Sequence, residues 1–184
     1  MKPTRDEPPP ARAATHADVA AIRRLIDASV RGLSTAHYTD RQIDSALQYV
    51  FGVDTQLIDD GTYFVIEGDD ELAAAGGWSR RKTLYGGDQF KTTSDPLLDP
   101  AVDAARIRAF FVHPSWARRG LARRLFEICE HAARREGFRA FELGATLPGI
   151  PLYEALGFVA AEPQAATMPD GEELPLVRMT RPIT

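Results

Sequence analysis

The sequence holds a single cysteine, Cys129, among its 184 residues, and no apolar run approaches the length of a membrane span. One cysteine cannot form a disulfide within the chain, so we expect a protein of a reducing compartment, the cytoplasm. Cys129 falls on the apolar side of a predicted helix, which indicates a buried small side chain rather than a nucleophile. Residues 1–11 lack the apolar core of a signal peptide, and their charges and prolines predict a disordered lead-in.

The chain also lacks an excess of positive charge. Its 26 acidic residues outnumber its 22 Lys and Arg, giving a net charge of −4, which argues against nucleic acid or an anionic membrane as a partner. Between Arg106 and Arg139, however, nine Arg stand against three Glu. This basic region in an acidic protein predicts a small anionic ligand. The length predicts one domain over residues 12–184.

Capping signals and apolar periodicity predict two helices and then a β-hairpin. Thr15-x-x-Asp18 and Thr39-x-x-Gln42 resemble capping boxes, and apolar residues follow each of them at helical spacing. Residues 62–67 are rich in strand formers, and a Gly-Asp-Asp turn follows them. Residues 71–78 are predicted as the second strand of the hairpin, although their run of Ala and Gly is weak strand material. The glycines near the end of the second strand indicate a bulge or the close approach of another group.

The most informative stretch is a strand, a basic turn and a helix in direct succession. Residues 105–112 predict the strand, which ends at His113-Pro114, and a helix is predicted over residues 118–136. The first amides of a helix lack partners and the helix dipole favours negative charge, so this turn can hold a pyrophosphate. Residues 138–143 predict a strand parallel to the first, because a helix joins the two. A short helix and two strands complete the chain, predicted at 151–156, 158–161 and 174–180.

Two motifs resemble the GNAT acyl-CoA N-acyltransferase superfamily: Val112-His-Pro-Ser-Trp-Ala-Arg-Arg-Gly-Leu-Ala122 and Pro151-Leu-Tyr-Glu-Ala-Leu-Gly-Phe158. The order of the predicted elements is similar to that family from about Arg12 to the end of the chain. The resemblance implies a mixed α+β fold: a twisted, mostly antiparallel central sheet with a splayed parallel strand pair, and helices on both faces. It also implies acetyl-CoA as co-substrate and no metal.

The resemblance implies that acetyl-CoA lies between the splayed strands and bonds to free backbone groups as an added strand would. Phe111 or Val112 would then lie near the acetyl carbonyl and help to polarise it. The family's turn pattern is Arg/Gln-x-x-Gly-x-Gly/Ala; Ala117 departs from it but keeps the backbone N–H that binds phosphate. Gly120 allows a close approach or a positive φ. The resemblance assigns the cofactor to Phe111, Val112, Ala117, Arg118, Arg119, Gly120, Leu121, Ala122, Thr146 and Tyr153.

Tyr153 is the candidate catalytic residue, since it stands where relatives carry a tyrosine that protonates the departing thiolate. A phenol with a pKa of about 10 keeps its proton at neutral pH and can donate it; the alternative is an aromatic ring that only packs on the sheet. Thr146 stands where many relatives carry Asn, and its hydroxyl can still donate to a cofactor carbonyl. The general base stays open among Glu142, Asp103, His113 and a chain of water molecules.

The substrate pocket is predicted from the first two helices, the hairpin and a long loop over residues 80–103, a length that is typical of functional loops. Trp78 and Tyr85 could equally be packing residues. The expected acceptor is an amine on a small molecule or peptide, and the sequence leaves a monomer and a homodimer open. The candidate pocket residues are His37, Tyr38, Trp78, Ser79 and Tyr85.

The resemblance therefore predicts an N-acetyltransferase in which an amine attacks acetyl-CoA directly. The alternative is a non-catalytic acyl-CoA-binding sensor or partner-binding module on the same fold. Thr146 and the lack of an acid on the central strand favour that module, whereas Tyr153 argues against it. The turn holds one glycine rather than the Gly-x-Gly-x-x-Gly spacing, which argues against a dinucleotide-binding oxidoreductase.

Overall fold

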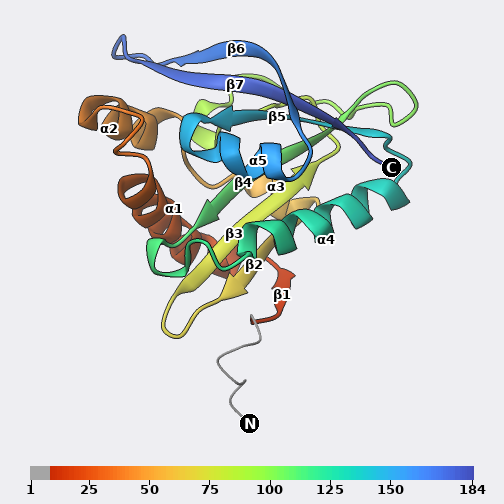
Figure 1. Ribbon diagram of the computed structural model, residues 1–184, viewed down its shortest axis with the longest axis horizontal. Coiled ribbons are helices and arrows are strands. Elements are labelled where there is room, and N and C mark those ends of the chain that lie inside the picture. The colour runs from red at the N-terminus through yellow and green to blue at the C-terminus, as the bar shows by residue number, and fades with distance from the viewer. Residues whose placement is uncertain (1–8) are drawn as a thin grey trace.

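The computed structural model describes residues 9–184, which form one seven-stranded sheet with helices on both faces (Figure 1). The strand order is β1-β2-β3-β4-β5-β7-β6. β4 and β5 run parallel, and all other neighbours are antiparallel. The predicted mixed fold with one parallel strand pair is therefore confirmed. The strands are β1 (Ala11–Ala13), β2 (Tyr63–Glu67), β3 (Leu72–Ser79), β4 (Ala105–Val112), β5 (Ala140–Thr146), β6 (Val159–Thr167) and β7 (Glu173–Pro182).

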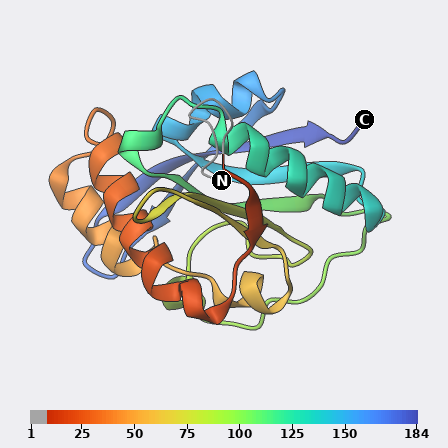
Figure 2. The same cartoon turned by 90° about the horizontal axis from the view of Figure 1, so that it is seen from below.

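The helices divide between the two faces of the sheet. Figure 2 shows α4 and α5 on one side and α1 and α3 on the other. Each side has its own apolar layer, with Ile22 and Leu25 under α1 and Phe126 under α4. Within residues 9–184, no helix combines the length and the apolar character that crossing a bilayer requires. The helices are α1 (Val19–Leu33), α2 (Asp40–Tyr49), α3 (Thr55–Asp59), α4 (Leu121–Arg135) and α5 (Ile150–Ala155).

Both predicted capping boxes are confirmed. Thr39 Oγ1 accepts from the Gln42 amide at 3.1 Å, and Gln42 Oε1 accepts from the Thr39 amide at 3.0 Å, which starts α2. The box of Thr15 and Asp18 starts a single 3-10 turn that leads directly into α1. Such caps satisfy amides that have no partner inside the helix, so they fix where the chain enters each helix.

Several predicted boundaries were wrong. The helix predicted from residue 118 begins at Leu121, because Arg118 (φ 65°) and Gly120 (φ 80°) adopt left-handed backbone conformations that a helix excludes. Elements of three and five residues, β1 and α3, were not predicted, since such short segments carry little periodicity. The strand predicted at 158–161 continues to Thr167 as β6. Residues 1–8 of the predicted lead-in lie outside the described residues, and Ala11 already belongs to β1.

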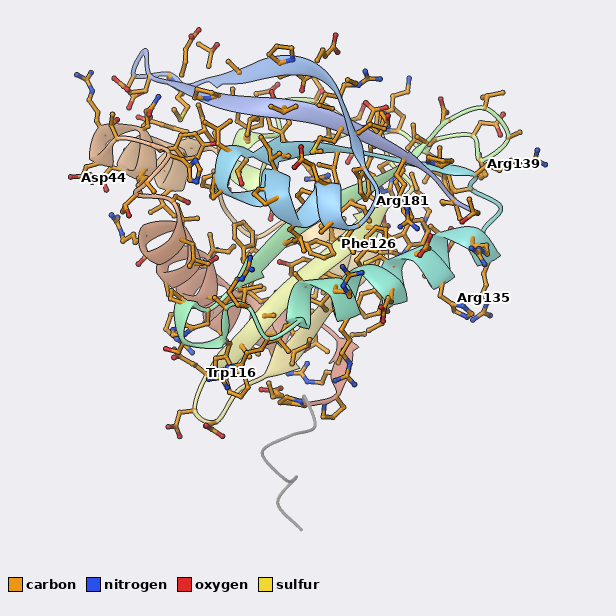
Figure 3. The ribbon with its side chains drawn as sticks, in the orientation of Figure 1. Asp44, Trp116, Phe126, Arg135, Arg139 and Arg181 are labelled. Atoms are coloured by element: carbon orange, nitrogen blue, oxygen red, sulfur yellow. The ribbon has the colours of Figure 1, made fainter. Side chains whose placement is uncertain are left out.

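α4 is fastened to the sheet by packing and by one cation. Cys129 is fully buried, as predicted, and burial raises the pKa of its thiol. Arg181 of β7 lies over the ring of Phe126, with Cζ 4.9 Å from the ring centroid, and pairs with Glu130 at 3.0 Å (Figure 3). These contacts hold the helix whose first turn belongs to the site described next.

Candidate active site

β4 and β5 pair only over their first residues and then separate. The parallel register joins Ala105 to Phe141 and Arg106 to Glu142, and no further pair follows. Beyond this point β4 continues to Val112 and β5 continues to Thr146, each without the other as a partner. The splayed pair implied by the resemblance is therefore present, and it leaves backbone groups of β4 open toward the gap.

A bulge in β4 shapes that gap. Ala109 has a positive φ of 54°, and its carbonyl accepts a hydrogen bond from Tyr63 Oη at 2.9 Å. Opposite it, a Cβ on Gly76 would lie 2.7 Å from the ring of Phe110, so glycine is required there. The register of β3 and β4 shifts between Ala75 and Gly77. The bulge predicted from the glycines of β3 is confirmed, and it redirects the end of β4.

The gap opens into a cavity of 230 Å³. The amide of Val112 points into it and donates a long hydrogen bond, 3.3 Å, to Ser29 Oγ of α1. The cavity thus joins the splayed strands to the face of the sheet that α1 covers. Its walls come from Ser29, Val30, Leu33 and Ser34 of α1, Val50–Gly52, Leu84–Gly87, Ile107–Val112 of β4, Gly144 and Thr146 of β5, and Pro148, Gly149, Leu152 and Tyr153 at α5.

The turn before α4 presents a row of open amides. Gly120 adopts a left-handed conformation, and α4 has no side-chain cap at its start. Within residues 9–184, the amides of residues 118–123 donate no hydrogen bond, whereas Arg124 already bonds to the Gly120 carbonyl. Successive free N–H groups at a helix start form an anion site. The turn therefore has the free amides that the predicted pyrophosphate site requires, and Gly120 has a positive φ, one of the two roles predicted for it.

Aromatic and imidazole contacts hold this turn. The guanidinium Cζ of Arg119 lies 4.8 Å from the Trp116 ring centroid, beside the β2–β3 hairpin (Figure 3). His113 Nδ1 accepts from the Ser115 amide at 3.2 Å, so its proton sits on Nε2 and faces Glu71 at 3.0 Å. His113 thus caps the turn with one nitrogen and ties it to the hairpin with the other, and it does not line the cavity.

Tyr153 stands at the edge of the cavity on α5. Its ring packs edge-on against Phe110 of β4 and Phe158, with centroids 6.5 and 5.7 Å apart. Burial raises the pKa of its hydroxyl, so the group stays protonated at neutral pH. The hydroxyl makes no hydrogen bond to a residue of the described chain. Thr146 lies next to it, since a Cβ on Gly149 would sit 3.2 Å from Thr146 Oγ1 and 3.3 Å from Tyr153 Cε2.

Of the five predicted pocket residues, Tyr85 lines the cavity and the other four do not. Tyr38 is buried and bonded twice, donating to the Pro175 carbonyl at 2.7 Å and accepting from the Leu147 amide at 2.9 Å. Trp78 packs on Phe138 in the apolar layer under α4 and does not reach the cavity. Ser79 accepts from the Arg81 amide, and His37 is exposed on the α1–α2 connection.

The candidate bases lie away from the cavity as well. Glu142 pairs with Arg178 at 2.8 Å and Arg106 at 3.2 Å. Asp103 accepts from the Asp99 amide at 2.8 Å within its own loop. Among the residues that line the cavity there is no carboxylate and no imidazole.

Sequence reasoning missed a buried ion pair at the wall of the cavity. Arg108 of β4 donates to Asp54 at 2.8 Å, and both side chains are 1% exposed. Arg108 also donates to the carbonyls of Gly86 at 2.6 Å and Thr83 at 3.1 Å, which fixes the loop that carries Tyr85. The available signal was Arg108 itself, one of two arginines in a strand whose other residues are apolar, since a cation needs a partner when it is buried. Ser29 and Phe51 of the cavity carried no such signal.

The chain was compared with known proteins. The family model described as acetyltransferase (GNAT) family matches residues 22–158. A GCN5-related N-acetyltransferase from Rhodopseudomonas palustris is similar in structure with a TM-score of 0.71 at 18% identity, over 97% of this chain and 98% of that one. No sequence among the curated proteins matches the chain.

Two further solved structures carry the cofactor in their descriptions. YncA from Salmonella typhimurium, described with acetyl-CoA, has a TM-score of 0.59 at 19% identity, over 95% of this chain and 94% of that one. The PaiA N-acetyltransferase from Thermoplasma acidophilum, in complex with coenzyme A, has a TM-score of 0.61 at 10% identity, over 94% of this chain and 98% of that one. At such identities the likeness concerns the fold.

Proposed function

The chain belongs to the acetyltransferase (GNAT) family, and on that premise we propose that it moves an acetyl group from acetyl-CoA to the nitrogen of an amine by direct attack. The gap between β4 and β5 carries the proposal. It opens beside a turn of free amides, and it has Tyr153 at its edge. The proposal therefore assigns the thioester arm to the open backbone of β4, the pyrophosphate to the turn that follows β4 in the chain, and proton donation to Tyr153.

The free amides after Arg118 are the proposed seat of the pyrophosphate, because N–H groups at a helix start and the helix dipole both favour an anion. The pantetheine arm would follow the open backbone of β4. Val112 N–H now reaches Ser29 only through a long bond. An acetyl carbonyl that replaces Ser29 as its acceptor would be polarised, and the developing oxyanion would be stabilised.

The proposed chemistry forms one C–N bond and breaks one C–S bond. A neutral amine attacks the acetyl carbonyl, and the resulting oxyanion collapses with departure of the CoA sulfur as a thiolate. Tyr153 donates its proton to that thiolate and regains a proton from the nitrogen, which becomes the neutral amide. Burial keeps Tyr153 protonated beforehand, as this role requires.

We infer that the amine is already neutral when it attacks. The cavity-lining residues include no carboxylate or imidazole that could take its first proton. That proton would leave to solvent as the amine enters. We also propose the cytoplasm as the place of action, because the single thiol, Cys129, is free and buried.

Thiol release from acetyl-CoA across a panel of amines tests the proposal. We expect release that depends on both the amine and the protein, with acetyl-CoA binding seen independently by calorimetry. Binding of acetyl-CoA with no release on any amine would contradict the transferase and favour a non-catalytic acyl-CoA-binding module. Absence of binding would contradict both.

A further inference from the structure

The acceptor end of the cavity is walled by apolar side chains. It comprises Val30, Leu33, Phe51, Leu84, Tyr85 and Phe111. The rings of Phe51 and Phe111 meet edge-on with centroids 6.1 Å apart, and Tyr85 is supported by Phe90 with centroids 5.6 Å apart. Leu33 is 38% exposed although it is a large apolar residue. Such walls stabilise a bound apolar group because they remove its surface from water, and the aromatic side chains favour an aromatic ring.

The same end offers no counter-ion to a cation. Arg108 is the only charged residue among those that line the cavity, and Asp54 neutralises it. The other oxygen of Asp54 pairs with Lys91 at 2.6 Å. Asp88, exposed on the loop nearby, accepts from the amide and hydroxyl of Thr55 and does not line the cavity. A second ammonium group on the acceptor would lose its hydration without gaining a carboxylate, which is costly.

We propose that the acceptor is a compact monoamine carrying an apolar group, an aromatic ring in particular, and that the site rejects acceptors with a second ammonium group. This inference rests on the proposed acetyltransferase function. The cavity of 230 Å³ must hold the acetyl end of the cofactor as well as the acceptor, so a small acceptor fits it. The nitrogen would face the Val112 amide and Tyr153, and the ring would lie between Phe51 and Tyr85.

Three amines that differ by one feature test the inference on the wild-type enzyme. The probes are 2-phenylethylamine, ethylamine, which lacks the ring, and 2-[4-(aminomethyl)phenyl]ethylamine, which adds a second ammonium group. We expect kcat/KM for 2-phenylethylamine to exceed that of each other probe by at least about 10-fold, as expected for burying an apolar ring and for leaving a charge unpaired.

A designed variant should shift this preference. Leu84→Asp places a carboxylate in the wall, so we expect the ratio of kcat/KM for monoamine over diamine to fall by at least about 10-fold. Leu97→Asp is the matched control, since Leu97 lies on the same loop, is 60% exposed and does not line the cavity. The control should keep the wild-type ratio.

The outcomes separate the inference from the function on which it rests. Acetylation of the diamine or of ethylamine at least as fast as that of 2-phenylethylamine would overturn the inference and leave the acetyltransferase standing. An unchanged ratio in folded Leu84→Asp would also overturn it. Bound acetyl-CoA with no turnover on any amine would remove the proposed function, and the inference with it.

Discussion

At the scale of single residues, Arg108 and Asp54 form an ion pair in which both side chains are 1% exposed. Burial lowers the pKa of Arg108, and the negative charge of Asp54 opposes this by stabilising the charged guanidinium. Asp54→Asn keeps a side-chain oxygen that can cap α3 but removes the charge. We expect the free energy of unfolding to fall by about 3–5 kcal/mol in urea denaturation, because a buried cation loses its partner.

Asp44→Asn is the control for that measurement. Asp44 pairs with Arg31 at 2.8 Å, but its side chain is 65% exposed (Figure 3). Solvent screens such a pair, so the change should cost less than about 1 kcal/mol. Equal losses in the two variants would mean that burial does not distinguish the pairs.

Tyr153→Phe tests the proposed proton donor. The change removes only the hydroxyl and keeps the ring between Phe110 and Phe158. We expect kcat to fall by about 10²–10⁴-fold with little change in acetyl-CoA affinity, since general acid catalysis contributes on that scale. The measurements are steady-state thiol release and calorimetric titration. A variant with wild-type kcat would show that Tyr153 only packs.

Ionisation of Tyr38 should make the free energy of unfolding depend on pH in the alkaline range. Burial raises its pKa to about 12, partly offset by the bond from the Leu147 amide. In the unfolded chain a tyrosine has a pKa of about 10, so the unfolded state loses this proton at a lower pH than the folded state does. The contribution of Tyr38 to stability is therefore lost as the pH rises from about 10 to about 12. The gap in unfolding free energy between wild type and Tyr38→Phe should narrow over that range, by up to about 1.4 kcal/mol per pH unit. Parallel stability curves would contradict this.

At the scale of elements, the turn before α4 tests whether backbone shape or charge binds the phosphates. Gly120→Val forces a β-branched residue into a left-handed conformation, which costs about 1–2 kcal/mol if the turn is kept. We expect the Kd for acetyl-CoA to rise by about 5–30-fold, more than in Arg118→Ala or Arg119→Ala. Equal increases in the three variants would mean that charge dominates.

Gly171→Val provides the matched control. Gly171 has a φ of 88°, and no atom lies within 4 Å of where its Cβ would be, as at Gly120. It lies in the β6–β7 turn, so the same backbone strain is placed far from α4. This variant should lose stability and keep the wild-type Kd.

Elements with strong local signals were predictable from the sequence. β4 has the predicted bounds, and both capping boxes start helical structure where expected. The start of α4 was predicted three residues early, because Arg118 and Arg119 are good helix formers, whereas the positive φ values of Arg118 and Gly120 place a turn there. The strand predicted at 138–143 lies at Ala140–Thr146, since pairing with β7 rather than local propensity sets its ends.

At the scale of the whole molecule, the proposed cofactor side of the site could be located from the sequence, and the proposed acceptor side could not. The phosphate turn and Tyr153 lie in local motifs that can be recognised in sequence. The walls of the proposed acceptor site come from α1, from residues 50–52 and 84–87, and from β4, which only the fold brings together. Tyr38 and Trp78 were predicted pocket residues, but tertiary packing buries them away from the cavity. An aromatic residue in a loop or hairpin can pack in a core as readily as it can line a pocket, and the sequence does not separate the two.

The central claim is that the whole site, from the phosphate turn to the acceptor cavity, performs acetyl transfer to an amine. Mass spectrometry of the amine, run beside a thiol assay in the same reaction, measures this most directly. We predict one N-acetylated amine formed for each CoA thiol released, with both rates lost together in Tyr153→Phe. Thiol release without an acetylated amine, which would be plain hydrolysis of acetyl-CoA, would contradict the claim.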